Sequence, residues 1–300
     1  SLGVLDRALN RVLAVGAQDV TGGALVLAGA DHPVTALGVS AFPASTTADV
    51  LAATVAGTSL GATSAAGAGL AVIAADCGVA QAIPGAREAR PAGERGDLAA
   101  RDAMTPADVA ALVAAGRKIG VEAAASGLVC LGEVGVGNTT VAATLACALL
   151  DLEPQDAVGL GSGSDADMVA RKRDVVAAAL ARTKGESDPL RLLAMVGGPE
   201  IALLTGVTLG AAAAGAPVVL DGLAASLPGV IAARLEPAAQ AYLLAGQVSR
   251  ERAHALVLRE LGLEPLLDLR LRAGEGVGAC LAASLVLQGL AVRRAAARTS

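Results

Sequence analysis

Short apolar runs alternate with longer, helix-like segments along most of the chain. Each run stops at a glycine or an aspartate, and uninterrupted apolar runs of this length are typical of strands buried on both faces of a sheet. The predicted strands cover residues 24–28, 70–75, 128–131, 192–196 and 217–220. Because strands separated by helices pair in parallel, this order predicts an α/β protein with a parallel sheet between two helical layers.

The segments between these strands predict helices. They cover residues 47–66, 105–125, 141–150, 168–181 and 199–214, and near the end of the chain 225–234, 250–261 and 277–297. Thr105 followed by Pro106 is a typical helix start. Residues 1–17 carry leucine and valine at helical spacing and predict an amphipathic helix. Residues 88–102 are charged, contain proline and glycine, and predict an exposed loop.

Acidic residues and glycine pairs stand where the predicted strands end. They are Asp31, Asp76, Glu133, Gly197, Gly198 and Asp221. Ligands of parallel α/β sheets bind at the carboxyl ends of the strands, where the chain turns into the following helix. The alignment of polar residues with strand ends therefore indicates an enzyme.

The stretch from Gly132 to Thr140, with the sequence GEVGVGNTT, joins a predicted strand to a predicted helix. Its glycines allow the backbone to turn sharply and to approach a ligand, while Asn138 and Thr139 can cap the helix or bind a substrate. A helix start offers backbone N–H groups to an anion, and Glu133 adds a carboxylate at the same point. The alternative is a plain strand-to-helix turn.

A second glycine-rich turn, GLGSGS at residues 159–164, precedes a helix that carries Lys172. Backbone N–H groups at the helix start and one cation would bind a phosphate monoester. The turn lacks the Gly-Lys-Ser/Thr ending of a P-loop and the third glycine of a dinucleotide-binding motif, so neither ATP nor NAD is supported. The alternative is an ordinary turn before a solvated basic helix face.

Residues 272–278, RAGEGVG, again place an acid between glycines before an apolar helix. Glu275 would be suited to proton abstraction there; the alternative is a carboxylate that caps the following helix. His32 follows a strand and could line a site, although a lone histidine is more often structural. His254 lies in a segment rich in Arg and Glu, which predicts a surface position.

The composition narrows the classes of function. The chain is 54% hydrophobic but only 1% aromatic, so it has few rings to stack on single-stranded nucleic acid. A net charge of −5, with the 23 lysines and arginines scattered, also disfavours a nucleic-acid partner. The four cysteines have no metal-ligand or disulfide spacing and predict buried thiols in a reducing compartment. Neither a metal nor a cofactor is indicated.

Residues 201–220 carry no charge over about the length of a membrane span. The segment contains Pro217 and is flanked by Glu200 and Asp221 rather than by basic residues. We interpret it as a helix followed by a buried strand. We therefore expect a cytoplasmic protein without a membrane span.

Two of these motifs resemble those of the nicotinate-nucleotide:dimethylbenzimidazole phosphoribosyltransferases, a family of cobalamin nucleotide-loop assembly. Residues 132–140 match the family's Gly-acid-hydrophobic-Gly-hydrophobic-Gly-Asn-Thr-Thr motif. Residues 272–279 match its Arg-Leu-Gly-Glu-Gly-Thr-Gly-Ala motif with two substitutions, Ala273 and Val277. Weaker matches in the same order run through most of the chain, among them 31–32 and 261–268.

The resemblance implies a fold. It is a Rossmann-like, three-layer parallel sheet with helices on both faces over residues 21–276. Residues 1–20 and 277–300 would form a small helical subdomain packed on this core. The resemblance also implies a homodimer.

The resemblance further implies transfer of 5-phosphoribosyl from nicotinate mononucleotide to a nitrogen of 5,6-dimethylbenzimidazole or a related aromatic base. The products would be an α-ribazole phosphate and nicotinate, without a cofactor or metal. Glu275 matches the family's catalytic glutamate and would take the N–H proton of the base, while Glu133 would stabilise positive charge on the ribose. Phosphate and ribose would bind to Gly135, Gly137, Asn138, Thr139, Gly161, Ser162, Gly163, Ser164 and Lys172. The base would bind to Asp31, His32, Ser40, Phe42, Ala273 and Gly274.

Departures from the family gather around the base pocket. Ala44 replaces a common Gln, an Asn is missing from residues 57–62, and Gly246-Gln247 replaces a Ser-His pair. The identity of the acceptor is therefore the open part of the prediction. The altered pocket also motivates a second hypothesis, a catalytically weak paralogue that binds a nucleotide or base as a partner or regulatory subunit. A nucleotide-dependent oxidoreductase is a third, which neither glycine motif supports.

Overall fold

The sheet has six parallel strands in the order β3-β2-β1-β4-β5-β6. The computed structural model describes residues 1–159 and 166–296 of the chain. The strands are β1 (Gly23–Gly29), β2 (Ala71–Asp76), β3 (Arg87–Glu88), β4 (Leu128–Val134), β5 (Val218–Leu220) and β6 (Leu243–Ala245). This order is that of the Rossmann fold. β2 and β3 are added on one side of β1, and β4, β5 and β6 are added on its other side. The predicted α/β class is confirmed.

Alternate residues of β1 point to opposite faces of the sheet. Ala24, Val26 and Ala28 belong to one apolar cluster, and Leu25 and Leu27 belong to another. The first cluster contains residues of α4 (Pro106–Ala124), α5 (Asn138–Leu150), α8 (Pro189–Val196), α9 (Pro199–Ala213) and α10 (Leu223–Leu235). The second contains residues of α1 (Val4–Ala14), α2 (Ser45–Val55), α3 (Leu60–Gly67) and α12 (Val277–Ala295). The three-layer architecture is therefore confirmed.

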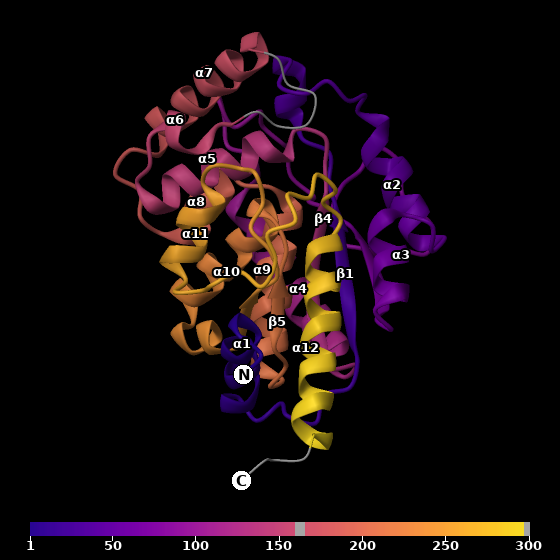
Figure 1. Ribbon diagram of the computed structural model, residues 1–300. Helices are drawn as coiled ribbons and strands as arrows, with labels where there is room; N and C mark the ends of the chain where they lie inside the picture. Colours follow the sequence, from indigo (N-terminus) through magenta and orange to yellow (C-terminus); the bar gives the residue numbers. More distant parts are fainter. Residues whose placement is uncertain (160–165, 297–300) are drawn as a thin grey trace.

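The remaining elements are the long helix α7 (Ala166–Thr183), the short helices α6 (Pro154–Ala157) and α11 (His254–Glu260), and two 3-10 helices, η1 (Pro33–Leu37) and η2 (Pro237–Tyr242). Figure 1 shows α7 at one end of the molecule, with α1 and the last turns of α12 at the opposite end. Segments far apart in the sequence thus share the end of the sheet at which the strands begin.

Helices α4 and α9 pack backbone against backbone. A Cβ at Gly116 would lie 2.0 Å from the carbonyl oxygen of Leu203, and one at Gly206 would lie 2.1 Å from that of Val113. Only glycine permits such an approach, because any side chain at these positions would overlap the facing helix. Close helix contacts of this kind fill the core of a chain that has almost no aromatic residues.

The structure corrects three predictions of secondary structure. Residues 192–196 are not a strand but the end of α8, which begins at Pro189. Asp188 caps this helix, because its Oδ1 accepts a hydrogen bond from the N–H of Leu190 at 2.9 Å. Short apolar runs do not distinguish a buried strand from a buried helix. Residues 47–66 form two helices, because the chain turns at Gly57 (φ 77°). The short strands β3 and β6 were not predicted.

Helices α1 and α12 lie against each other, and Arg293 donates to Asp6 Oδ1 at 2.7 Å. Both helices share the second apolar cluster with β1. The division into residues 21–276 and a helical subdomain of 1–20 and 277–300 stays a prediction.

The apolar segment 201–220 is resolved as buried α9 followed by buried β5, as expected. By length and composition alone, two segments of the described chain, Thr46–Gly67 and Val277–Ala295, could cross a membrane. The first is divided between α2 and α3, and the second contacts β4 and β5.

Candidate active site

A cavity of about 560 Å³ opens where β4, β5 and β6 end. Glu133 at the end of β4, Asp221 after β5 and Gln247 after β6 all line it. Many of the residues with predicted roles meet here: Ser40, Phe42, Glu133, Gly135, Gly137, Asn138, Thr139, Lys172, Ala273, Gly274 and Glu275. The cavity lies at the carboxyl edge of the sheet, the position at which ligands bind in folds of this topology.

The turn after β4 forms one wall of the cavity. The Asn138 side-chain amide, in the first turn of α5, donates to Glu133 Oε2. A Cβ at Gly135 would lie 2.7 Å from both the Ala30 carbonyl oxygen and His32 Nε2, so this position requires glycine. The turn therefore presents its acid in a fixed orientation at a helix N-terminus.

The pKa of the Glu133 carboxyl group lies well above its ordinary range. Burial is the main cause of its pKa being raised to about 8. The nearby carboxylates of Glu200, Asp221 and Glu275 raise the pKa further, in that order, whereas the hydrogen bond from Asn138 lowers it. An acid with such a pKa carries little charge at neutral pH and gains charge readily when a cation approaches.

The turn that carries Glu275 has left-handed backbone angles at three successive residues. The φ angles are 94° at Gly274, 57° at Glu275 and 76° at Gly276. A glutamate is unusual in this region of φ, and such strain is found at functional sites. Its Oε2 accepts a hydrogen bond from the N–H of Gly61 at 3.0 Å, in the first turn of α3. Glu275 therefore does act as a cap, but on α3 rather than on the helix that follows it.

Two further residues of the site were not assigned a role from the sequence. Asp221 is buried after β5, where its Oδ1 accepts from Gln247 Nε2 at 2.7 Å and from the N–H of Ala279 at 3.2 Å. Burial raises the pKa of Asp221 to about 6, against the effect of these hydrogen bonds. The position of Asp221 at a strand end was the available signal. For Gln247 the only signal in the sequence is its departure from the family motif.

Lys172 of α7 lines the cavity and is 6% exposed. Burial lowers the pKa of Lys172, and the neighbouring Glu251 opposes this shift. Arg250 and Arg272 also line the cavity, so positive charge faces it from three separate segments. The predicted phosphate-binding residues Gly161, Ser162, Gly163 and Ser164 lie outside the described part of the chain.

Asp31 and His32 have predicted roles in base binding but are not among the described residues that line the cavity. His32 is buried beneath Gly135, and its Nε2 lies 3.3 Å from Glu200 Oε1. Asp31 Oδ2 accepts from the N–H of Ala80 at 2.7 Å. Their role in base binding stays a prediction.

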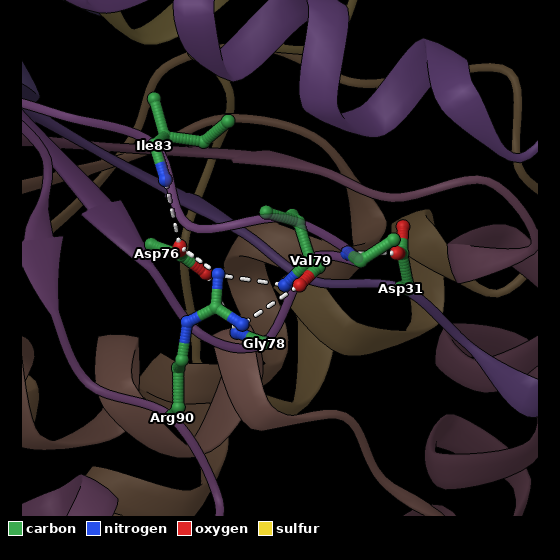
Figure 2. A network of polar contacts seen from close by, with 7 residues as sticks. Asp31, Asp76, Gly78, Val79, Ile83 and Arg90 are labelled. Atoms are coloured by element: carbon green, nitrogen blue, oxygen red, sulfur yellow. Dashed lines mark hydrogen bonds and ion pairs between the residues drawn. The ribbon is translucent and has the colours of Figure 1, made fainter.

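Asp76, at the end of β2, closes the loop that follows this strand (Figure 2). Its carboxylate accepts hydrogen bonds from the backbone N–H groups of Gly78, Val79 and Ile83 and from the guanidinium of Arg90. Figure 2 also shows Asp31 reaching the same loop. A carboxylate so fully hydrogen-bonded fixes a loop and has little capacity left for a ligand.

The prediction for His254 was wrong. The side chain is fully buried, its Nε2 lies 3.0 Å from Ser226 Oγ, and its Nδ1 accepts from the N–H of Ser249 at 2.8 Å. Burial lowers the pKa of His254 to about 4. The histidine thus anchors the segment from Ser249 to Glu251, which lines the cavity.

The four cysteines are buried and free, as predicted. Within residues 1–159 and 166–296, no group of three or more His, Cys, Asp or Glu side chains could hold a metal ion.

Comparisons with known proteins agree with the motifs. The model of a family described as "Phosphoribosyltransferase" matches residues 1–300. A nicotinate-nucleotide–dimethylbenzimidazole phosphoribosyltransferase of Thermus thermophilus is 39% identical and covers 99% of this chain and 89% of its own. One of Variovorax paradoxus is 41% identical, over 86% of this chain and 74% of its own.

A solved structure gives the same result. The crystal structure of CobT from Thermus thermophilus superposes with a TM-score of 0.92 at 38% sequence identity, covering 98% of this chain and 90% of that one. Both the sequence match and the structural match cover nearly the whole chain. The chain belongs to the nicotinate-nucleotide–dimethylbenzimidazole phosphoribosyltransferase family.

Proposed function

We propose that this protein transfers 5-phosphoribosyl from nicotinate mononucleotide to a nitrogen of 5,6-dimethylbenzimidazole or a related aromatic base. The products are an α-ribazole phosphate and nicotinate. One observation carries the proposal: in a chain of this family, Glu133 and Glu275 line one cavity from two turns that are hydrogen-bonded to each other.

The reaction exchanges one C–N bond for another. The bond from ribose C1′ to the pyridinium nitrogen breaks, and its electron pair stays with nicotinate, which leaves without needing a proton. Positive charge develops on the ribose, and Glu133 and Asp221 line the cavity where they can stabilise it. A ring nitrogen of the acceptor attacks C1′ with its lone pair, and the acceptor's N–H proton passes to Glu275. The Gly61 N–H holds the Glu275 carboxylate in place for this transfer.

The ribose phosphate binds on the turn after β4. Gly135 and Gly137 allow close approach of the backbone, and Asn138 and Thr139 offer polar groups at the start of α5. Lys172 supplies a cation at the same cavity. The buried position of Lys172 strengthens its attraction for a phosphate, because little water competes there.

The aromatic base binds between the 272–275 turn and the segment after η1. Ser40 and Phe42 line the cavity from the second of these, and Ala273 and Gly274 from the first. Phe42 is the only phenylalanine of the chain and is 52% exposed, so its ring is available for stacking. This wall suits a flat, weakly polar acceptor.

We also infer that the protein is a homodimer in the cytoplasm. Leu281, Leu285 and Val292 form an exposed apolar stripe on α12, which carries no charge from 277 to 292. Such a stripe favours a protein–protein contact. The buried free thiols fit a reducing compartment. Light scattering of the wild type and of Leu285→Glu tests the dimer, which the variant should weaken.

Incubation of the purified protein with nicotinate mononucleotide and dimethylbenzimidazole, followed by chromatography, tests the activity. We expect acceptor-dependent release of nicotinate together with a new nucleotide that contains the base. A panel of benzimidazoles, purines and phenols then ranks the acceptors. Tight ligand binding without turnover for any acceptor would instead favour a binding paralogue.

A further inference from the structure

A buried carboxylate lies behind the cavity, on the far side of the turn after β4. Glu200 belongs to the first turn of α9 and is 0% exposed. Its carboxylate folds back over Gly198, where a Cβ would lie 2.6 Å from both of its oxygens. The space that this acid occupies therefore explains the glycine at position 198, whereas a Cβ at Gly197 would lie 2.6 Å from the carbonyl oxygen of Leu193.

The imidazole ring of His32 faces the carboxylate of Glu200. The distance from His32 Nε2 to Glu200 Oε1 is 3.3 Å, and the two side chains are 2% and 0% exposed. Within the described residues, neither oxygen of Glu200 nor His32 Nε2 has a partner in hydrogen-bond geometry. An acid so buried and so poorly hydrogen-bonded costs stability, which points to a role in the neighbouring site rather than in folding.

The pair is adjacent to the ribose-binding turn. The His32 ring lies directly beneath Gly135, two residues from Glu133, and leaves no room for a Cβ there. Among the charged groups near Glu133, Glu200 contributes most to raising the pKa of Glu133, after burial itself. The other groups facing Glu133 are Asn138, Asp221 and Glu275.

Other charged groups also face Glu200. Arg95 lies close enough for Glu200 to favour its charged form, and it donates to the carbonyl oxygen of Asp31 at 2.9 Å. The buried Cys77 thiol is likewise within reach of Glu200, and burial together with that carboxylate raises its pKa. Arg95 offsets part of the charge of Glu200, but Arg95 itself is not among the described residues that line the cavity.

We propose that Glu200, packed behind the turn after β4 and facing His32, is a positioning residue: its buried carboxylate opposes a negative charge on Glu133 in the empty site, and the positive charge of a bound ligand overcomes that opposition. The role of the cation rests on the proposed function, in which the ligand is the pyridinium nucleotide. Glu133 then releases one proton to solvent as the nucleotide binds, and takes one up again after nicotinate and the product have left. Glu133 is thus negatively charged during the step in which the ribose carries positive charge.

Titration of Glu133 in the ligand-free protein tests the proposal without any assay of turnover. Full-length protein with ¹³C-labelled glutamate carboxyls is titrated by NMR, and the Glu133 signal is identified by its loss in Glu133→Gln. We expect Glu200→Gln to move the Glu133 midpoint about one pH unit or more toward acid. A midpoint that does not move would overturn the proposal.

Glu200→Asp keeps the negative charge but places it farther from Glu133, because the side chain is shorter. It should therefore give a smaller shift of the Glu133 midpoint in the same direction, and it replaces Glu200→Gln as the test if that variant does not fold. Thr205→Val is the matched control, because it changes a buried side chain of the same helix, whose hydroxyl donates to the Ile201 carbonyl oxygen at 2.8 Å. The control should leave the Glu133 midpoint unchanged. A shift in Thr205→Val equal to that in Glu200→Gln would contradict a specific role for Glu200.

Calorimetry with nicotinate mononucleotide in buffers of different ionisation enthalpy measures the proton released on binding. At pH 7 we expect close to one proton for the wild type and much less for Glu200→Gln. Normal turnover with equal proton release in both proteins would refute the positioning role alone. If the wild type shows no turnover with any acceptor while the Glu133 midpoint is still acid-shifted in Glu200→Gln, the proposed function is refuted and the positioning role stands.

Discussion

The backbone N–H of Glu275 donates a hydrogen bond to the carbonyl oxygen of Glu133, 3.2 Å away. The two turns meet so closely that a Cβ at Gly132 would lie 2.8 Å from the backbone carbon and oxygen of Glu275. Each acid is therefore positioned partly by the backbone of the other. This contact joins two motifs that are far apart in the sequence and makes them one site.

The division of roles between the two acids predicts unequal effects of substitution. In the proposed mechanism Glu275 takes the acceptor's proton, so Glu275→Ala should lower kcat about 100-fold or more. Glu133→Ala should lower kcat less, because in the same mechanism Asp221 would still stabilise the charge on the ribose. Steady-state assays of nicotinate release compare the two variants.

Glu88→Ala is the control for this comparison, since Glu88 is exposed on β3 and is not among the described residues that line the cavity. The control should behave as the wild type. A larger loss in Glu133→Ala than in Glu275→Ala would reverse the assignment of roles.

Two glycines of α3 should respond to alanine in opposite ways. A Cβ at Gly61 would lie 2.2 Å from the backbone oxygen of Glu275, so Gly61→Ala should displace the turn that carries Glu275, lower kcat and cost about 1–3 kcal/mol of stability. A Cβ at Gly67 would meet nothing within 4 Å, so Gly67→Ala should leave kcat unchanged and add about 0.5 kcal/mol. Chemical denaturation and kinetics of both variants measure this contrast, and equal effects would contradict it.

Glu133 should make the folded state less stable as the pH rises. Its pKa is raised from the ordinary value of 4.5 to about 8, so the folded protein binds more protons at this site than the unfolded chain between these two values. The free energy of unfolding therefore falls through this window as the pH increases. Glu133→Gln should remove this slope, which urea denaturation from pH 5 to 8 would detect. Identical slopes in the two proteins would exclude the effect.

His254 should affect both stability and substrate binding. His254→Ala removes the acceptor of the Ser249 N–H, should cost about 1–3 kcal/mol, and should raise the KM for the nucleotide through the loosened segment at Ser249. Because burial lowers the pKa of His254 from 6.5 to about 4, the wild type should also lose stability as the pH falls between these values. The variant should lack this acid-side slope in urea denaturation.

Arg259→Ala, on the exposed side of the same helix α11, is the matched control for the histidine. It should leave the KM and the acid-side slope as in the wild type. An unchanged KM in His254→Ala would show that the cavity wall does not depend on this anchor.

Local patterns were sufficient for most of the fold. The apolar runs at 24–28, 70–75, 128–131 and 217–220 predicted their strands, because a strand buried on both faces must be apolar along its whole length. The same reasoning gave the wrong result for residues 192–196. Asp188 and Pro189 start a helix there, and this helix is so buried in the core that its sequence is as apolar as that of a strand. The three-residue strand β6 was too short to leave a pattern.

The sequence by itself determined the α/β class, the family and the two acidic turns, because these depend on residue type and on spacing within short segments. Tertiary structure alone decided that Glu133 and Glu275 share a backbone hydrogen bond, that Gly61 holds the Glu275 carboxylate, and that His32 faces Glu200. Each of these contacts joins strand ends or helix starts that only the order of strands in the sheet brings together. The physical reason is that the protonation of an acid depends on every charge around it, and most of those charges come from other parts of the chain.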